Sequence, residues 1–283
     1  SVEEAERRVL VLENPMFAGQ SRITTSLYAG MQLVLPGERA RSHRHTQSAL
    51  RFVLEGTGAY TAVGGERTPM YPGDFIITPS WEWHDHGNDT PDPVIWLDGL
   101  DIPLVQALDA SFMEHLGAVE QPVTRPVGDS FARYGSNLLP VDHRSSGLTS
   151  PVFSYPYART REALETLRRN GGPDPYHGYK MRFVNPVTGG FAMPTIATFM
   201  QLLPRGLTTQ PYRSTDATVF TPVEGEGRTH IGGTVIEWSA RDVFIAPGWA
   251  TVRHEASSDA VLFSFSDRPV QQATGLFREE RLA

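Results

Sequence analysis

The chain has 283 residues, enough for two domains of ordinary size, and its 40% hydrophobic and 20% charged content is that of a globular protein. The net charge is −7 and Lys180 is the single lysine, so an acidic chain without a basic run argues against nucleic-acid binding. The sequence contains no cysteine, which excludes disulfides, thiolate metal sites and cysteine nucleophiles.

The first third of the chain predicts a set of short strands. Residues 1–10 are charged and predicted to be helical, and they lack the apolar core of a signal peptide. No apolar run approaches membrane-spanning length, so we expect a cytoplasmic protein without a membrane partner. Between Gly and Pro turn signals, β-branched and aromatic residues predict strands over residues 24–35, 49–54, 58–63, 75–78 and 94–97. Short strands at this spacing are typical of an all-β barrel or sandwich.

Helices are predicted in the middle of the chain. Apolar residues with helical spacing predict a helix over residues 104–116 that packs on the outside of the barrel. Residues 120–157 are rich in Pro, Ser and Gly and predict an extended connection. Residues 159–170 predict an amphipathic helix that ends at Gly171-Gly172-Pro173.

Three histidines in two motifs predict a metal site. His43 and His45 are two residues apart, so their imidazoles share one face of a strand, and His84 follows 39 residues after His45. The alternative interpretation is ordinary polar residues on a strand and in a turn. The flanking residues, however, resemble the two-motif signature of the cupin barrel: a glycine six before His43, another eleven after His45, and the spacing Gly73, Pro79, His84, Asn88. Three neutral imidazoles in a barrel form a divalent-metal site with open positions.

The second half of the chain repeats the first at an offset of 168 or 169 residues. The repeated pairs are Gly206 and Gly37, residues 223–227 and 54–58, and residues 241–249 and 73–81. Two tandem copies of one barrel are the simplest interpretation. We predict an N-terminal barrel at residues 1–120, a linker at 121–158 and a C-terminal barrel at 159–283. At the ligand positions the second copy has Tyr212, Ser214 and Val252, while His254 matches His86, so the metal site belongs to the first copy.

The ligand set favours a particular chemistry. Many metal-binding cupins have a glutamate four residues after the second histidine, and that position here is Ala49. An all-imidazole set is neutral, so a divalent ion keeps its charge and suits an anionic substrate that chelates through two oxygens, with one position left for dioxygen. Activation of dioxygen requires a metal that donates an electron, which favours Fe(II). Zn or Mn remains an alternative.

Other polar residues near the histidines have two interpretations each. Arg51 lies six residues after His45 and either binds a carboxylate or forms a salt bridge to Glu55 or a nearby aspartate. His86 acts either as an acid or base or as a structural histidine. Asp98 is predicted to fix an imidazole or the Arg51 side chain.

Much of the chain resembles the ring-cleaving gentisate 1,2-dioxygenases. The resemblance rests on residues 27–33, 42–52, 78–87, 96–104, 155–161, 185–190, 211–215 and 263–269. It implies a bicupin, which consists of two tandem double-stranded β-helix (jelly-roll) barrels with a few peripheral helices, usually assembled as a homotetramer. It also implies Fe(II) on His43, His45 and His84. A small aromatic hydroxy acid would chelate the iron through its carboxylate and adjacent hydroxyl, dioxygen would bind beside it, and the ring would open between the carbons that bear those groups. For gentisate the product is maleylpyruvate.

The resemblance also implies roles for individual residues. Arg51 would bind the substrate carboxylate, assisted by Arg7, and Gln32, His86 and Asp98 would line the pocket. Tyr28 stands where a salicylate-cleaving relative has tryptophan, which favours gentisate.

Three alternative functions remain open from the sequence. One is a salicylate or 1-hydroxy-2-naphthoate dioxygenase of the same family. Another is a non-catalytic cupin that binds a small ligand, and the third is an isomerase or hydrolase that uses Zn or Mn.

Overall fold

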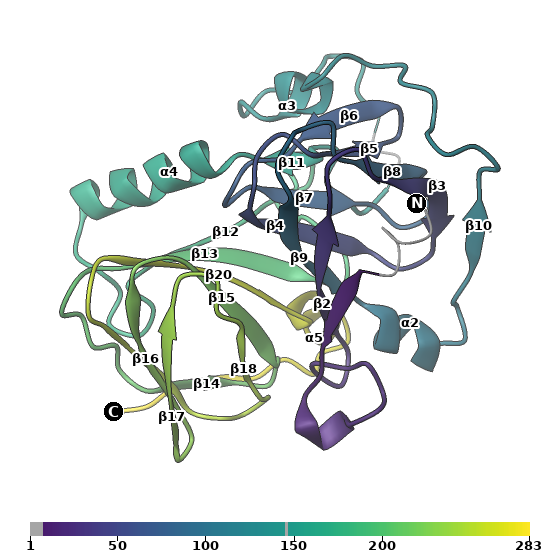
Figure 1. The fold of residues 1–283 in the computed structure, drawn as a ribbon. Coiled ribbons are helices and arrows are strands. Elements are labelled where there is room, and N and C mark those ends of the chain that lie inside the picture. Colours follow the sequence, from purple (N-terminus) through teal and green to yellow (C-terminus); the bar gives the residue numbers. More distant parts are fainter. Residues whose placement is uncertain (1–7, 145–146) are drawn as a thin grey trace. The chain divides into compact units, whose positions relative to one another are not determined.

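Strands dominate the computed structural model, which describes residues 8–144 and 147–283 (Figure 1). The chain divides into two compact units. The first takes the chain up to Tyr157 together with Val184–Met193, and the second consists of Ala158–Phe183 and Pro194–Ala283. Each unit contains two antiparallel sheets. The predicted all-β architecture of two jelly-roll barrels is therefore confirmed.

The first unit pairs a six-stranded sheet with a five-stranded sheet. The larger sheet has the order β1-β2-β9-β4-β7-β11, with strands at Val9–Leu12, Tyr28–Val34, Val94–Leu100, Ala49–Glu55, Phe75–Thr78 and Ser154–Tyr155. The smaller sheet has the order β10-β3-β8-β5-β6, with strands at Met113–His115, Arg39–His45, His84–Gly87, Tyr60–Val63 and Glu66–Pro69. The helices of the first unit are η1 (Pro15–Phe17), α2 (Ile102–Ala107) and α3 (Asp129–Tyr134). Because the chain passes back and forth between the two sheets, β3 and β8 become neighbours although they are far apart in the sequence.

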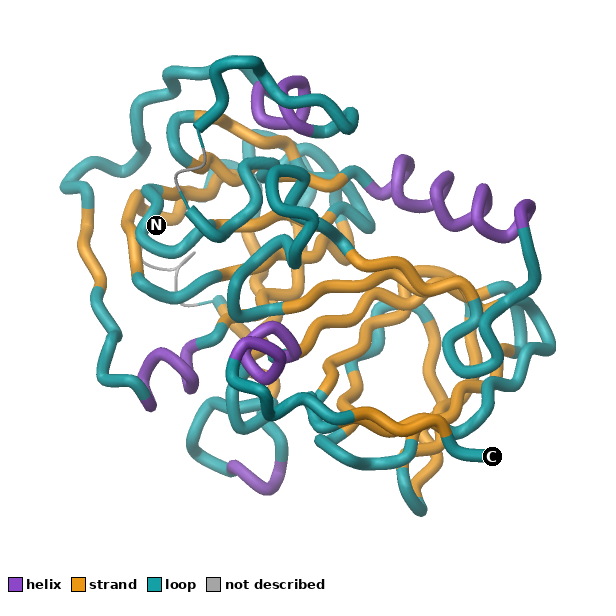
Figure 2. Tube along the Cα trace, turned by 180° about the vertical axis from the view of Figure 1, so that it is seen from behind, coloured by secondary structure: helices purple, strands orange, loops and turns teal. Residues whose placement is uncertain are grey.

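The second unit repeats this topology. One sheet has the order β12-β13-β20-β15-β18, with strands at Tyr179–Arg182, Ala197–Leu203, Ala260–Ser266, Thr218–Glu224 and Phe244–Ala246. The other has the order β17-β16-β19-β14-β21, with strands at Thr234–Ser239, Glu226–Ile231, Val252–Ala256, Tyr212–Ser214 and Glu279–Arg281. The helices are α4 (Tyr157–Asn170) and α5 (Arg268–Ala273). Figure 2 shows these strands as a ring seen nearly end-on.

Each barrel has its own apolar core between its sheets. In the first unit the core includes a cluster of fully buried side chains: Val34, Val53, Ala59, Met70, Ile76, Val94 and Trp96. In the second unit it includes Leu203, Phe220, Ile231, Trp238, Phe244, Ala246, Ala256, Ala260 and Leu262. Successive side chains of a strand point to opposite faces of its sheet, so a slip of one residue would turn these core side chains outward, and the core therefore fixes the register. The same register fixes which polar side chains point inward.

The repeated Glu-Gly turns are explained by a close approach of two backbones. Gly56 and Gly225 both have positive φ, of 84° and 77°. A Cβ added at Gly56 would lie 2.4 Å from the Pro93 carbonyl oxygen, and one at Gly225 would lie 2.3 Å from that of Asp259. Only glycine fits at either turn.

Two predicted helices are wrong in part. The helix predicted over residues 104–116 ends at Ala107, and Met113–His115 is instead strand β10, paired with β3. Leu108 and Phe112, two of the apolar residues with helical spacing, are exposed, so a longer helix would not bury its apolar face here. Pairing with the edge of β3 instead provides hydrogen-bond partners for the backbone N–H and C=O groups of this segment. In the helix predicted over residues 1–10, Val9 and Leu10 belong to strand β1, because they pair with the edge of β2; residues 1–7 lie outside the described residues.

The other secondary-structure predictions have mixed outcomes. The helix predicted over residues 159–170 is confirmed as α4. The connection predicted to be extended over residues 120–157 contains helix α3, which begins after Gly128.

Candidate metal centre

Three histidines meet on neighbouring strands of the first barrel. His43 and His45 lie on β3, and His84, the first residue of β8, pairs directly across from His43. Their ligand atoms all lie within 4.8 Å of one another, and the ring centroid of His84 is 4.3 Å from that of His43 and 4.7 Å from that of His45. The sequence prediction that these three imidazoles converge agrees with this geometry.

The backbone orients each imidazole in the same way. Nδ1 of His43 lies 2.7 Å from the Arg41 carbonyl oxygen, and His45 and His84 have the equivalent contact, at 2.9 Å, to the carbonyl oxygens of Gln47 and Glu82. A carbonyl oxygen only accepts, so each Nδ1 carries the proton and the metal-binding lone pair is on Nε2. The main chain therefore selects the tautomer that binds a metal.

The charge state of the cluster also fits a metal. Burial, followed by the neighbouring His43 and then Arg51, lowers the pKa of His45 to about 4, and the pKa of His84 is lowered well below its usual value by the same causes. Neutral imidazole is the form that binds metals. His84 is fully buried, and its Nε2 has no hydrogen-bond partner among the described residues; a bound cation would coordinate the lone pair of that nitrogen. The residues present fit a divalent ion.

A buried ion pair lies in the same barrel. Arg51 on β4 pairs across from Asp98 on β9, with Nε 3.4 Å from Asp98 Oδ1. Arg51 Nη1 donates to Thr78 Oγ1 at 2.6 Å, and the Trp96 indole donates to Asp98 Oδ1 at 3.0 Å. Burial raises the pKa of Asp98 to about 6, although the Arg51 charge and the Trp96 hydrogen bond oppose that rise. Of the two interpretations for Arg51, the salt bridge to an aspartate is present, and Nη2 makes no further hydrogen bond within the described residues.

His86 is held by a threonine that the sequence analysis did not single out. His86 Nδ1 is 3.0 Å from Thr61 Oγ1, and its ring centroid is 5.8 Å from that of His84. The side chain is buried, which lowers its pKa well below the usual value. The internal repeat carried the missing signal, since Thr229 and His254 form the same contact at 2.8 Å in the second barrel.

The remaining predicted pocket residues lie on β2. Gln32 is buried and pairs across from Trp96, and Gly30 pairs across from Asp98. Burial and the Asp98 charge raise the pKa of Tyr28 to about 12, and a Cβ added at Gly30 would lie 2.5 Å from the Tyr28 hydroxyl. Glycine therefore makes room for the Tyr28 ring. Arg7 lies outside the described residues.

Comparison of the two barrels separates structural residues from candidate functional ones. Tyr212 pairs with Val252 in the register that pairs His43 with His84, so the cross-strand ligand pair has no counterpart in the second barrel. Phe220 and Ser264 likewise replace the Arg51–Asp98 pair.

An arginine–tryptophan contact, in contrast, is present in both barrels. Arg44 lies 4.6 Å from the ring centroid of Trp81, and Arg213 lies 4.6 Å from that of Trp249. Both tryptophans have positive φ. A contact that survives loss of the metal ligands is structural.

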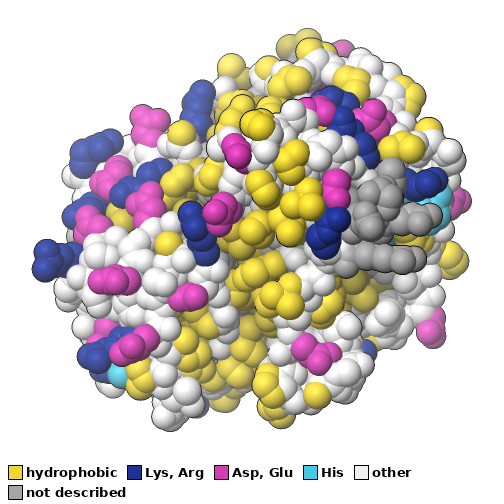
Figure 3. Space-filling model, viewed as in Figure 1, with side chains coloured by type: hydrophobic (Ala, Val, Ile, Leu, Met, Phe, Trp, Pro, Cys, Tyr) yellow, Lys and Arg dark blue, Asp and Glu magenta, His cyan; other side chains and the backbone are white. Residues whose placement is uncertain are grey.

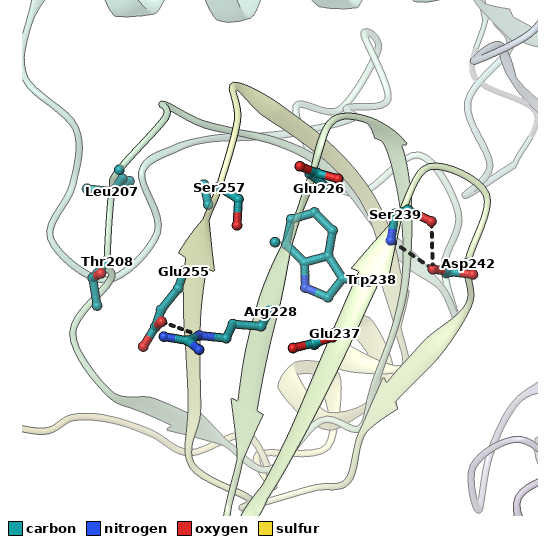
Figure 4. A pocket seen from close by; sticks show the side chains of 13 residues that line it. Leu207, Thr208, Glu226, Arg228, Glu237, Trp238, Ser239, Asp242, Glu255 and Ser257 are labelled. Atoms are coloured by element: carbon teal, nitrogen blue, oxygen red, sulfur yellow. Dashed lines mark hydrogen bonds and ion pairs between the residues drawn. The ribbon is translucent and has the colours of Figure 1, made fainter.

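The second unit contains an open cavity of about 680 Å³ on its barrel wall (Figure 4). Most of the charged side chains that line the cavity are acidic (Figure 4). Arg228 forms an ion pair with Glu255, and Asp242 accepts a hydrogen bond from the Ser239 amide. An acidic wall with its one arginine already paired repels an anionic acid. This cavity is therefore a poor site for an aromatic acid.

Surface charge is mixed on the face shown in Figure 3, where basic and acidic side chains alternate without a continuous basic region. No helix within the described residues is long and apolar enough to cross a membrane.

Comparison with known proteins places these observations in a family. A family profile described as cupin domain matches residues 30–100. The chain is 60% identical over 281 residues to a gentisate 1,2-dioxygenase from Aquipseudomonas alcaligenes, covering 99% of this chain and 81% of that protein. It is 36% identical to a 5-aminosalicylate 1,2-dioxygenase from Comamonas, covering 99% of this chain and 75% of that one.

Solved structures agree with the sequence comparison. The salicylate 1,2-dioxygenase from Pseudaminobacter salicylatoxidans is 34% identical with a TM-score of 0.92, covering 98% of this chain and 80% of that one. A variant of that enzyme in complex with gentisate gives a TM-score of 0.91 at 34% identity, covering 97% of this chain and 78% of that one. The chain belongs to the gentisate 1,2-dioxygenase family of iron-dependent, ring-cleaving bicupin dioxygenases.

Proposed function

We propose that the protein is an Fe(II)-dependent gentisate 1,2-dioxygenase that opens the ring between the carboxyl-bearing and hydroxyl-bearing carbons and gives maleylpyruvate. The observation that carries the proposal is the set of three converging imidazoles in the barrel that also buries Arg51. Such a site would combine a bound metal ion with the Arg51 guanidinium, which can bind a carboxylate. The 60% identity to a gentisate 1,2-dioxygenase supports the choice of substrate.

His43, His45 and His84 would hold the iron through Nε2. Bound Fe(II) would supply the electron that activates dioxygen and a positive charge for the carboxylate and hydroxyl oxygens of the substrate. The carbonyl oxygens on each Nδ1 keep the rings in place, so little ordering remains to be done when the metal binds.

Arg51 would bind the substrate carboxylate. Thr78 accepts a hydrogen bond from Nη1 and the Asp98 carboxylate lies 3.4 Å from Nε as an ion pair, which leaves Nη2 for the ligand. A guanidinium fixed in this way loses little side-chain entropy on binding. Arg7, predicted to assist, lies outside the described residues and remains a prediction.

His86 would exchange a proton with the substrate or with reduced dioxygen. Its contact with Thr61 fixes the ring, and burial keeps it neutral, so one nitrogen can donate while the other accepts. Gln32, Tyr28 and Asp98 would complete the wall of the pocket. The phenol of Tyr28 has a pKa of about 12 and so offers a hydroxyl donor rather than a phenolate.

A salicylate-type acid is the second candidate substrate. The likeness to a salicylate 1,2-dioxygenase and to a 5-aminosalicylate 1,2-dioxygenase supports it. Both substrate classes present a carboxylate beside a hydroxyl, so Arg51 and the histidines would treat them alike. The choice between them rests on the side chains around the far edge of the ring.

The test is oxygen uptake after anaerobic loading with Fe(II). With gentisate we expect one O2 consumed per ring and a product that absorbs in the near ultraviolet. Protein loaded with Zn(II) is the control and is expected to consume none. No oxygen uptake with gentisate, salicylate or 1-hydroxy-2-naphthoate would overturn the proposal in favour of a ligand-binding cupin or a Zn or Mn enzyme.

Assembly and location are further predictions. The resemblance implies a homotetramer, and light scattering after size-exclusion chromatography would measure its mass. A cytoplasmic location is the matching prediction, and cell fractionation would test it.

A further inference from the structure

The interior of the second barrel holds a small polar cavity where the first barrel holds its histidines. Its lining includes Tyr212, Ser214 and Val252, the residues at the three ligand positions. The cavity measures about 30 Å³, which exceeds the minimum of roughly 10–15 Å³ that a water molecule requires. Loss of the metal ligands has therefore not led to an interior filled with apolar side chains.

Lys180, the single lysine of the chain, contributes a charge to this cavity. It lies on β12 across from Gln201, and its Nζ is 4.8 Å and 5.9 Å from the ring centroids of Phe199 and Phe220. Among the described residues no carboxylate oxygen lies within ion-pair distance of Lys180 Nζ. In the first barrel the residue across from Gln32 is the apolar Val9. The charged side chain at this position therefore occurs in the second barrel and not in the first.

The other charges around the cavity cancel one another. Arg268 Nε lies 3.0 Å from Asp216 Oδ2, Nη2 donates to Oδ1 at 3.3 Å, and Ser266 also donates to Asp216 Oδ2. Burial lowers the pKa of His254 and of His177 to about 3, so both are neutral at pH 7. The site therefore retains one net positive charge, on Lys180.

Gln201 provides an independent observation. Its side chain is 1% exposed, and its Nε2 donates to the His177 carbonyl oxygen at 2.8 Å. That bond fixes the amide orientation; Gln201 lines the cavity, and its Oε1 has no hydrogen-bond partner within the part of the chain that the structure describes. A buried acceptor left unpaired is unfavourable, so Gln201 Oε1 favours a molecule in the cavity that donates a hydrogen bond to it.

An outer cleft gives access to the same cation. The cleft measures about 320 Å³ and shares Lys180 and Arg268 with the inner cavity. Lys180 therefore borders both the open cleft and the inner cavity.

We propose that the second barrel is a binding site for a small monoanion of about the size of formate, held by Lys180, with a water molecule that donates one hydrogen bond to the anion and one to Gln201 Oε1. The site is separate from the proposed catalytic function and requires no metal. A single negative charge neutralises the site, and the small volume of the inner cavity excludes an aromatic acid.

The single lysine makes a direct test possible. Lysine labelled with ¹³C at Cε gives one side-chain signal, whose shift reports the charge of Lys180. Burial, followed by the charge of Arg268, lowers the pKa of Lys180 to about 8, with Asp216 opposing. A bound anion favours the charged amine, so saturating formate is expected to raise the pKa by at least one unit in a saturable manner. Sodium gluconate, which is too large for the cavity, keeps the ionic strength constant.

A second measurement compares the melting temperatures of the wild type and two variants. Formate is expected to raise the melting temperature of the wild type and of Arg228→Met, which removes an exposed arginine elsewhere on the second unit, but not of Lys180→Met. The proposal is overturned if the Lys180 signal keeps its pKa up to 100 mM formate, or if neutral formamide has the same effect. Oxygen uptake with gentisate is measured in parallel, so failure of this site is distinguished from failure of the proposed function.

Discussion

Arg51 and Asp98 lie directly opposite each other on β4 and β9 and form a buried ion pair, with Nε 3.4 Å from Oδ1. The same register in the second barrel brings together Phe220 and Ser264. The charged pair therefore occurs in the barrel that carries the three histidines and is absent from the other. A charge is buried at a cost, so its presence beside the candidate metal site indicates a function.

Replacement of Arg51 tests its role in binding. Arg51→Ala is expected to raise KM for the aromatic acid by roughly 30-fold or more, which corresponds to about 2–5 kcal/mol for a buried charge pair. The turnover number should change less, because the carboxylate is bound equally in the ground state and the transition state. Arg44→Ala, on the neighbouring sheet, is the control. An unchanged KM in Arg51→Ala would assign Arg51 to structure alone.

Replacement of His84 tests the metal site. His84→Ala removes one of three ligands and is expected to abolish stoichiometric iron binding, measured by atomic emission after gel filtration. His230→Ala, at a histidine paired with Glu255 in the second barrel, should keep its iron. Full iron content in His84→Ala would contradict the assignment of the ligands.

Addition of one methyl group at Gly30 tests the position of Tyr28. The new Cβ would lie 2.5 Å from the Tyr28 hydroxyl and 2.8 Å from Val9 Cγ1, so Gly30→Ala must displace one of these side chains. We expect a loss of stability of about 1–3 kcal/mol and a change in the ratio of kcat/KM between gentisate and salicylate. Gly171→Ala, where no atom lies within 4 Å, is the matched control. Equal ratios in both variants would place Tyr28 outside the specificity pocket.

Asp74 predicts a pH dependence of stability. Burial raises its pKa to about 6, although it accepts hydrogen bonds from the backbone amides of Tyr71 and Tyr157. The folded state thus binds the proton more tightly than the unfolded state, whose value is near 3.8. The stabilisation that protonated Asp74 gives to the folded state is fully present below pH 3.8, and it is lost as the pH rises to about 6.

Asp74→Asn isolates that contribution, because titrations elsewhere cancel in the comparison. Between pH 4 and pH 7 the wild type should lose up to about 3 kcal/mol relative to Asp74→Asn in urea unfolding. A difference that stays constant with pH would mean that Asp74 titrates normally in the folded protein.

The sequence by itself determined the parts of the site that depend on local spacing. His43 and His45 are two residues apart on a strand, so they share a face whatever the rest of the chain does. The internal repeat identified Tyr212 and Val252 as the residues at two of the ligand positions, and the paired strands of the second barrel place them accordingly.

Only the tertiary structure decided which partners these residues meet. Arg51 is bound to Asp98 and Thr78 because β4 lies between β9 and β7, and no local pattern fixes that order. Met113–His115 is a strand because the edge of β3 offers it hydrogen bonds, although its apolar spacing is helical. Lys180 faces a cavity because β12 pairs with β13, which the sequence does not reveal. Spacing fixes the face of a strand, whereas the register between distant strands depends on which side chains the whole barrel buries.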